Sequence, residues 1–180
     1  MPPDAPAQPA PRFLLRHELR PGDLGYLVYL HGTVYAREYG FDPTFEAYVA
    51  GPMAEFVRTR TDRDRLWIAE RARRIVGCIA IVGANPQQAQ LRWFLVDPSV
   101  RRLGLGRTLL HQAVEFSRSS AYESIFLWTV STLTAAARLY QQFGFHKAEE
   151  RPGRLWGVDV VEEKYLLQLD DAAAPRSAAV

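Results

Sequence analysis

The stretch that decides the fold runs from residue 95 to residue 110 and reads Leu95-Val96-Asp97-Pro98-Ser99-Val100-Arg101-Arg102-Leu103-Gly104-Leu105-Gly106-Arg107-Thr108-Leu109-Leu110. An apolar run ends at Val96 as a strand would, a glycine-containing turn follows, and Leu105 and Leu109 begin the apolar stripe of a helix. Backbone N–H groups at the start of a helix lack intrahelical partners, and the helix dipole adds positive charge there. The stretch therefore predicts an anion-binding turn suited to a pyrophosphate.

Glycines and arginines give this turn its chemistry. Gly104 and Gly106 allow a ligand to approach the backbone closely, and three arginines raise the local potential: Arg101, Arg102 and Arg107. A Walker phosphate loop would need Gly-Lys-Ser/Thr, whereas Gly106 is followed by Arg107-Thr108. A dinucleotide fingerprint would need a third glycine where Leu109 stands. Both of these phosphate-binding loops are therefore disfavoured.

On both sides of the turn, helical and strand-like spacings of apolar residues alternate. Asp23 is expected to cap the first helix, Gly51-Pro52 to interrupt and kink the second, Ser131 or Thr132 to cap the last, and Gly144 to end it. The predicted strands are residues 13–19, 66–69, 75–82, 91–96, 125–130, 145–150 and 160–169, and the predicted helices are 23–39, 42–57, 104–119 and 131–142. This order predicts the α+β class with a mixed central sheet.

Length, composition and charge bound the function. The 180 residues are 48% hydrophobic and 23% charged, which indicates one globular domain. We place it at residues 12–170, between a proline-rich disordered tail, 1–11, and a second disordered tail, 171–180. The formal net charge of +2 is too small for a dedicated nucleic-acid binder. No apolar run approaches the ~20 residues of a membrane span, and the start does not resemble a secretory signal.

The single cysteine, Cys78, excludes an internal disulfide and a multi-cysteine zinc site. The four histidines share no ligand spacing, so no metal is expected. A reducing, cytoplasmic location is the simplest interpretation.

Two motifs at a characteristic separation resemble one enzyme superfamily. Arg101-x-x-Gly104-x-Gly106 resembles the Q/R-x-x-G-x-G/A signature of the GNAT superfamily of acyl-CoA-dependent N-acetyltransferases. Ala136-x-x-Leu139-Tyr140-x-x-x-Gly144-Phe145 resembles the helix and strand that follow in that superfamily. More narrowly, four segments resemble the acetyltransferase half of MarR–GNAT fusion proteins: His31-Gly32, residues 35–40, Phe45-Glu46-Ala47 and Leu155-Trp156-Gly157. The chain leaves no room for a winged helix, so DNA binding by this chain alone is not expected.

The resemblance implies the GNAT fold, acetyl-CoA as co-substrate, and direct transfer of an acetyl group to a primary amine. The aromatic residues Tyr35, Tyr39, Phe41 and Trp93 favour a small molecule with an apolar part as the acceptor, and the alternative acceptor is a lysine of a protein. Tyr140 occupies the position at which many members protonate the departing thiolate. Main-chain groups of Leu95 and Val96, on a bulged strand that splays from its neighbour, would pair with the pantetheine arm. The remaining cofactor contacts implied are Arg101, Arg102, Leu103, Gly104, Leu105, Gly106, Arg107 and Thr108, and the substrate contacts are Tyr35, Tyr39, Glu46 and Trp93.

The sequence departs from the superfamily pattern at two positions. Gln90 stands where many members carry a glutamate as general base, and an amide has no useful basicity. Glu46, Glu38 or His31 would then act through water, or the amine would arrive neutral and need no strong base. Leu133 replaces an asparagine that often contacts the cofactor. These departures motivate an alternative function, a non-catalytic acyl-CoA-binding sensor or interaction module. The resemblance also allows a homodimer.

Overall fold

The computed structural model describes residues 13–169; the predicted tails, 1–11 and 171–180, lie outside the described residues. The elements follow the predicted order: β1 Leu14–Arg16, α1 Asp23–Tyr39, α2 Thr44–Thr59, β2 Arg65–Arg71, β3 Arg74–Gly83, β4 Gln88–Val96, a short 3₁₀ turn Pro98–Val100, α3 Leu105–Ser119, β5 Ser124–Val130, α4 Thr134–Gln142, β6 His146–Leu155 and β7 Val158–Gln168. The strands form one mixed sheet in the order β1-β2-β3-β4-β5-β7-β6.

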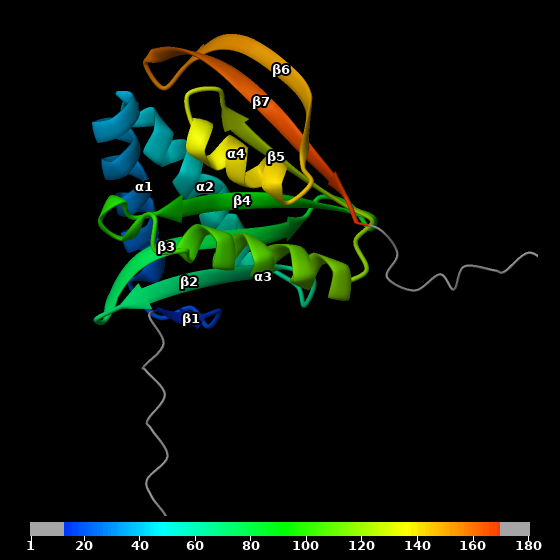
Figure 1. Cartoon of the computed structure of the whole chain (residues 1–180). Helices are drawn as coiled ribbons and strands as arrows, with labels where there is room; N and C mark the ends of the chain where they lie inside the picture. Colours follow the sequence, from blue (N-terminus) through cyan, green and yellow to red (C-terminus); the bar gives the residue numbers. More distant parts are fainter. Residues whose placement is uncertain (1–12, 170–180) are drawn as a thin grey trace, which may run out of the picture.

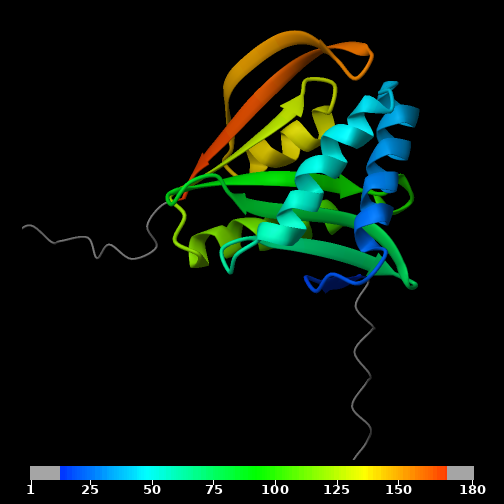
Figure 2. The same cartoon turned by 180° about the vertical axis from the view of Figure 1, so that it is seen from behind.

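Helices cover both faces of this sheet. Figure 1 shows α3 and α4 on one face, and Figure 2 shows α1 and α2 on the other. Successive strand residues point to opposite faces, so neighbours in β3 enter different cores. Ile79 packs in the core that includes Leu105 and Leu109, and Cys78 packs in the core that includes Leu27 and Met53. This layered arrangement confirms the predicted α+β class and mixed sheet.

Strands β4 and β5 pair over only a short length. They are parallel neighbours, and their register ends at the pair Gln90 and Phe126. Beyond it β4 continues to Val96 and β5 to Val130 without pairing to each other. From residue 91 onward, β4 therefore has no strand partner on its β5 side, and the sheet opens there into a V. This is the splay that the sequence predicted at Leu95 and Val96.

A β-bulge changes the direction of β4 inside this V. Cys78 is opposite Leu95 and Ala80 is opposite Arg92, so β4 carries one extra residue between these pairs. Trp93 lies in the bulge with φ +48°, a left-handed conformation that is rare for a bulky residue. The Cys78 thiol donates a hydrogen bond of 3.0 Å to the Trp93 carbonyl. Burial raises the pKa of this thiol to about 12, so it stays protonated and keeps this donor role.

Several expected helix ends differ in the structure. Asp23 is not the cap of α1; Gly22 is, because the Asp23 carboxylate accepts 2.7 and 2.8 Å hydrogen bonds from the buried Arg16 guanidinium. Helix α2 continues through Pro52 instead of being interrupted there, with buried residues on both sides such as Val49 and Phe56. A proline removes one helical hydrogen bond, and tertiary packing of the apolar face offsets that loss.

The last helix also begins later than predicted. Leu133, not Ser131 or Thr132, precedes its first turn, and no side chain caps it. Gly144 follows its end with φ +89°, as predicted for a helix-terminating glycine.

Candidate active site

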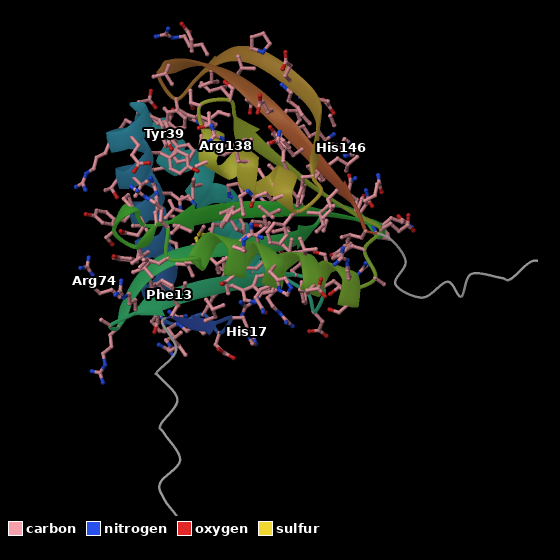
Figure 3. All side chains as sticks on the ribbon, in the orientation of Figure 1. Phe13, His17, Tyr39, Arg74, Arg138 and His146 are labelled. Carbon is pink, nitrogen blue, oxygen red and sulfur yellow. The ribbon has the colours of Figure 1, made fainter. Side chains whose placement is uncertain are left out.

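A cavity of about 520 Å³, which we term the cofactor cavity, lies in the V beyond the paired part of β4 and β5. Its walls come from α1, the end of β4, the following loop, the start of α3 and the start of α4. Figure 3 labels Tyr39 on α1 and Arg138 on α4, two helices that contribute side chains to these walls. The lining residues are Val34, Tyr35, Tyr39, Phe94, Leu95, Val96, Val100, Arg101, Arg102, Leu105, Gly106, Thr132, Leu133, Thr134, Ala135, Ala136 and Leu139.

Unpartnered backbone amides follow one another along the turn of residues 102–107, of which Arg102, Leu105 and Gly106 line the cofactor cavity. Thr108 is the first residue of α3 whose N–H reaches a carbonyl, that of Gly104. Among residues 13–169, the backbone N–H groups of residues 102–107 have no backbone hydrogen-bond acceptor. The chain folds so because Arg102 and Gly104 both adopt left-handed φ values, +60° and +88°. Successive free amides at a helix start fit the diphosphate of a coenzyme.

The three arginines of the turn do not act alike. Arg101 forms a bidentate ion pair with Glu38 at 2.8 and 2.9 Å, and its Nε donates to the Val96 carbonyl at 3.1 Å. Arg107 binds the side chain of Gln142 and lies over the Phe143 ring. Arg102 lines the cavity, and within the described part of the chain it has no ion pair. Of the three, only Arg101 is neutralised by a carboxylate; Arg102 and Arg107 keep their charge, and of these two Arg102 lines the cavity.

The predicted cofactor residues fall into two groups. Six line the cofactor cavity: Leu95, Val96, Arg101, Arg102, Leu105 and Gly106. Four do not line it: Leu103, Gly104, Arg107 and Thr108. The Thr108 hydroxyl donates to the Gly104 carbonyl at 3.2 Å, and Leu103 packs against the core, so these residues shape the turn.

A second, smaller cavity of about 110 Å³, which we term the acceptor cavity, lies beside the bulge. It shares four lining residues with the cofactor cavity: Tyr35, Phe94, Leu133 and Ala136. Nine aromatic side chains line it: Tyr35, Phe41, Phe45, Tyr48, Trp93, Phe94, Trp128, Tyr140 and Trp156. Its polar lining consists of side chains that include His31, Gln90, Arg92, Thr129 and Glu162. The two cavities therefore meet at the bulged strand.

The predicted substrate contacts occupy different places. Tyr35 lines both cavities, Trp93 lines the acceptor cavity and Tyr39 lines only the cofactor cavity. Glu46 lines neither, because its side chain lies against Gly32 in the space that a Cβ there would fill. Two helices can pack this closely only where one carries glycine.

His31 is the site residue whose geometry the sequence did not specify. Its side chain is buried, 3% exposed, and lines the acceptor cavity. Its Nδ1 lies 2.8 Å from the Leu27 carbonyl, which accepts a hydrogen bond from an Nδ1–H. Nε2 is then an acceptor, and it is the one buried side-chain polar atom within residues 13–169 that lacks a partner. Burial lowers the pKa of His31 to about 4, so the ring is neutral at neutral pH.

Tyr140 lines the acceptor cavity from α4. Its ring packs near Phe94, Phe145 and Tyr165 at centroid distances of 6.0, 5.8 and 5.8 Å. Burial raises the pKa of this phenol well above its usual value, and it does the same for Tyr35. Both phenols therefore stay protonated at neutral pH. Tyr140 is thus both a core residue and a cavity residue, whereas Tyr35 stands at the junction of the two cavities.

A family model described as "Acetyltransferase (GNAT) family" matches residues 26–145, from α1 to the residue before β6. The chain belongs to this family. Membership confirms the predicted fold and the predicted enzyme class, an acetyltransferase that uses acetyl-CoA. The free amides of residues 102–107 suit that co-substrate. The narrower resemblance to MarR–GNAT fusion proteins stays a prediction.

Individual relatives agree with this membership. An N-acetyltransferase family 8 member 3 of Rattus norvegicus is 34% identical over 47% of this chain, and an uncharacterized N-acetyltransferase of Schizosaccharomyces pombe is 31% identical over 64%. The matches span 39% of the rat protein and 72% of the yeast protein. The structure of an acetyltransferase from Salmonella typhimurium with its cofactor acetyl-CoA has the same fold, with a TM-score of 0.73 and 17% identity over 93% of this chain and 99% of that one.

The described residues offer no metal site. Within residues 13–169, no group of three or more His, Cys, Asp or Glu side chains could hold an ion. Figure 3 shows the labelled His17 and His146 in separate parts of the molecule. In the same residues, no helix combines the length and apolar character that a bilayer crossing requires.

Proposed function

We propose that this chain transfers the acetyl group of acetyl-CoA directly to the primary amine of a small molecule. The observation that carries the proposal is the junction of the two cavities at the bulge, where Tyr35 and Phe94 line both. A ligand that extends through the cofactor cavity to this junction places its acyl end beside the acceptor cavity. The small volume and aromatic lining of the acceptor cavity favour a compact acceptor over a polypeptide.

His31 is the residue proposed to take the proton from the amine. Of the three candidates, Glu38 is engaged by Arg101, and Glu46 lines neither cavity. His31 lines the acceptor cavity and has a free Nε2. An amine N–H that donates to Nε2 has its lone pair held in one orientation, and Nε2 receives the proton as the C–N bond forms.

Tyr140 is the residue proposed to donate a proton to the departing sulfur. Its buried phenol is protonated, since burial raises its pKa, and the acceptor cavity that it lines adjoins the cofactor cavity. One proton leaves the amine and one arrives at the sulfur. His31 and Tyr140 are then restored by exchange with water, and no covalent enzyme intermediate is needed.

The experiment that tests the proposal measures free thiol released from acetyl-CoA in the presence of a panel of small amines. Amine-dependent release is expected. The alternative function, an acyl-CoA-binding sensor, is favoured by Gln90 and Leu133, which line the acceptor cavity without supplying a base. Coenzyme binding by calorimetry without thiol release for any amine would support the sensor and overturn the enzyme.

His31→Gln separates the proposed proton acceptor from a structural histidine. We expect kcat to fall by about tenfold or more, with the coenzyme Kd unchanged. His111→Gln is the matched control, because His111 is an exposed residue of α3 that lines neither cavity. His31 titrates far below neutrality, so its protonation would reduce the rate only as the pH falls towards about 4. The ratio of wild-type to variant kcat should therefore be constant from about pH 6 to about pH 9.

Three further expectations remain proposals. A cytoplasmic location is supported by Cys78 being the single cysteine and buried. Assembly as a homodimer is supported by β6, which is the outer strand at one edge of the sheet and can pair with another copy. Kinship with MarR–GNAT fusion proteins is supported by the residues of α1 and α2 quoted above. Light scattering of the purified chain tests the dimer.

A further inference from the structure

Arg92 is a charged side chain of the acceptor cavity that has no counter-ion within residues 13–169. It comes from β4, one residue before Trp93, and lines the cavity while half-buried. Its guanidinium lies 5.0 Å from the Trp93 ring centroid. Within residues 13–169 it takes part in no ion pair, whereas the buried Arg16 is paired with two carboxylates. Partial burial also lowers the pKa of Arg92, which marks a charge removed from water without compensation.

The one acidic side chain of the cavity does not compensate it. Glu162 reaches the cavity from β7, on the far side of β5 from β4. Among the described residues, no ion pair within 4 Å joins Glu162 to Arg92. The cavity thus presents a separated cation and anion on an otherwise aromatic wall. A guanidinium of this kind offers a planar fork of N–H donors that matches a carboxylate.

We infer that Arg92 binds a carboxylate of the acceptor, so that the acceptor is an amino acid with an apolar side chain. The inference rests on the proposed function and names its substrate class. The carboxylate supplies the missing counter-charge of Arg92, Glu162 faces the cationic end of the incoming zwitterion, and the aromatic wall contacts the side chain. The ammonium group first gives one proton to water, and an N–H of the resulting neutral amine then donates to His31 Nε2. A diamine would instead leave Arg92 facing a second positive charge.

The test compares matched acceptors that differ only at the carboxylate. Thiol release is measured with phenylalanine, phenylalaninamide and phenethylamine, and with leucine, leucinamide and isopentylamine. Arg92→Gln should lower kcat/KM for the amino acids by about tenfold to about hundredfold, as expected for a lost charged hydrogen-bond pair, and should change it less than about threefold for the other amines. Arg92→Lys should retain part of the activity with amino acids. Comparing wild type and variant on one acceptor cancels the intrinsic reactivity of that amine.

Arg65→Gln is the matched control. Arg65 is also half-buried, stacks over an aromatic ring, Phe116, and lines neither cavity. Arg65→Gln should leave kcat/KM unchanged for all six acceptors. Thermal melting of both variants reports whether the fold is kept.

The outcomes separate the inference from the proposed function. Thiol release with phenethylamine or with a diamine such as putrescine, but not with amino acids, would overturn the inference and leave the enzyme intact. An equal loss of kcat/KM for the acceptors with and without a carboxylate in Arg92→Gln would also overturn it. If no amine releases thiol, leucine is titrated into the CoA-bound protein by calorimetry. Binding that Arg92→Gln abolishes would support the anion site without catalysis, and no binding would overturn it.

Discussion

The cofactor cavity and the acceptor cavity adjoin at one bulged strand, yet different atoms build their working surfaces. At the cofactor cavity the polar groups are largely backbone, since the amides of residues 102–107 are unpartnered and the β5 side of residues 91–96 carries no strand. At the acceptor cavity the polar groups are side chains, chiefly His31, Arg92 and Tyr140, set among aromatic rings. Backbone groups are offered by any sequence that adopts the turn, whereas side chains are specific to this chain.

This difference has an energetic consequence. A cavity that binds through amides should tolerate changes of neighbouring side chains, provided that the turn keeps its shape and its space. A cavity that binds through side chains should lose rate or selectivity with each one removed. Coenzyme affinity and turnover should therefore respond to different substitutions.

The largest effect is expected where a side chain is added to the backbone-built cavity. Gly106 lines the cofactor cavity, and a Cβ there would lie 3.5 Å from Leu139 Cδ2 and 3.6 Å from Phe94 Cζ. Gly106→Leu extends a bulky group beyond that Cβ into the coenzyme's space. We expect the coenzyme Kd, measured by calorimetry, to rise about hundredfold or more.

The control for this prediction is Gly25→Leu. Gly25 is exposed on α1, and nothing lies within 4 Å of a Cβ built there. Both substitutions replace glycine by a good helix former inside a helix, so neither should destabilise that helix. Coenzyme binding by Gly106→Leu within about threefold of wild type would place the coenzyme elsewhere.

The next largest effect is expected at the side-chain-built cavity. Tyr140→Phe should lower kcat by about tenfold or more and leave the coenzyme Kd unchanged, because only the proton donor is removed. Burial raises the pKa of Tyr140, so the phenol stays protonated as the pH rises. The wild-type rate should therefore show no alkaline loss from Tyr140 below about pH 10. Rates at saturating acceptor, in single-turnover conditions, provide the measurement.

Tyr35→Phe sharpens this prediction. Tyr35 lines both cavities, and burial raises the pKa of its phenol as it does for Tyr140, so it is the rival donor. We expect a loss of less than about threefold in kcat. If Tyr35→Phe instead shows the larger loss of kcat and Tyr140→Phe the smaller one, the proton donor is Tyr35 of α1 rather than Tyr140 of α4.

Much of the fold was readable from the sequence because it depends on local patterns. The order of strands and helices and the helix stop at Gly144 follow from apolar periodicity and glycine chemistry. The splay at Leu95 and Val96 was instead implied by the resemblance to the GNAT superfamily. The cap of α1 was predicted wrongly, because the Asp23 carboxylate pairs with the buried Arg16 guanidinium. Arg16 is seven residues away and lies on another element. Long-range pairing of this kind leaves no local signal.

The two cavities differ in the same way. A motif marks the cofactor turn, and six of its ten predicted residues line the cavity. The acceptor cavity draws on α1, α2, β4, β5, α4 and β7, so no short stretch marks it. Arg92 carried no signal in the sequence, because only the fold reveals that no carboxylate of the described residues pairs with it. Glu46 stood in a promising position, but helix packing directs its carboxylate to Gly32.

The smallest effects are expected from the arginines of the cofactor turn, because the amides supply most of the binding. Arg102→Ala should raise the coenzyme Kd by about threefold to tenfold at low salt and by less at high salt, since an exposed charge is screened. Arg107→Ala should change it less than about twofold, because Arg107 points to Gln142 and does not line the cavity.

Arg101 tests whether the amides or the charges dominate. Arg101→Ala removes one cation and at the same time leaves the Glu38 carboxylate without its ion-pair partner, next to the cofactor turn. We expect the coenzyme Kd of Arg101→Ala to rise by about fivefold, mostly because of this unpaired anion. The double variant, Arg101→Ala with Glu38→Gln, should have a coenzyme Kd within about twofold of wild type. Because the double variant lacks the guanidinium as well, recovery would mean that Arg101 acts by neutralising Glu38 while the amides hold the phosphates. A double variant no better than Arg101→Ala would show instead that the guanidinium itself binds the coenzyme.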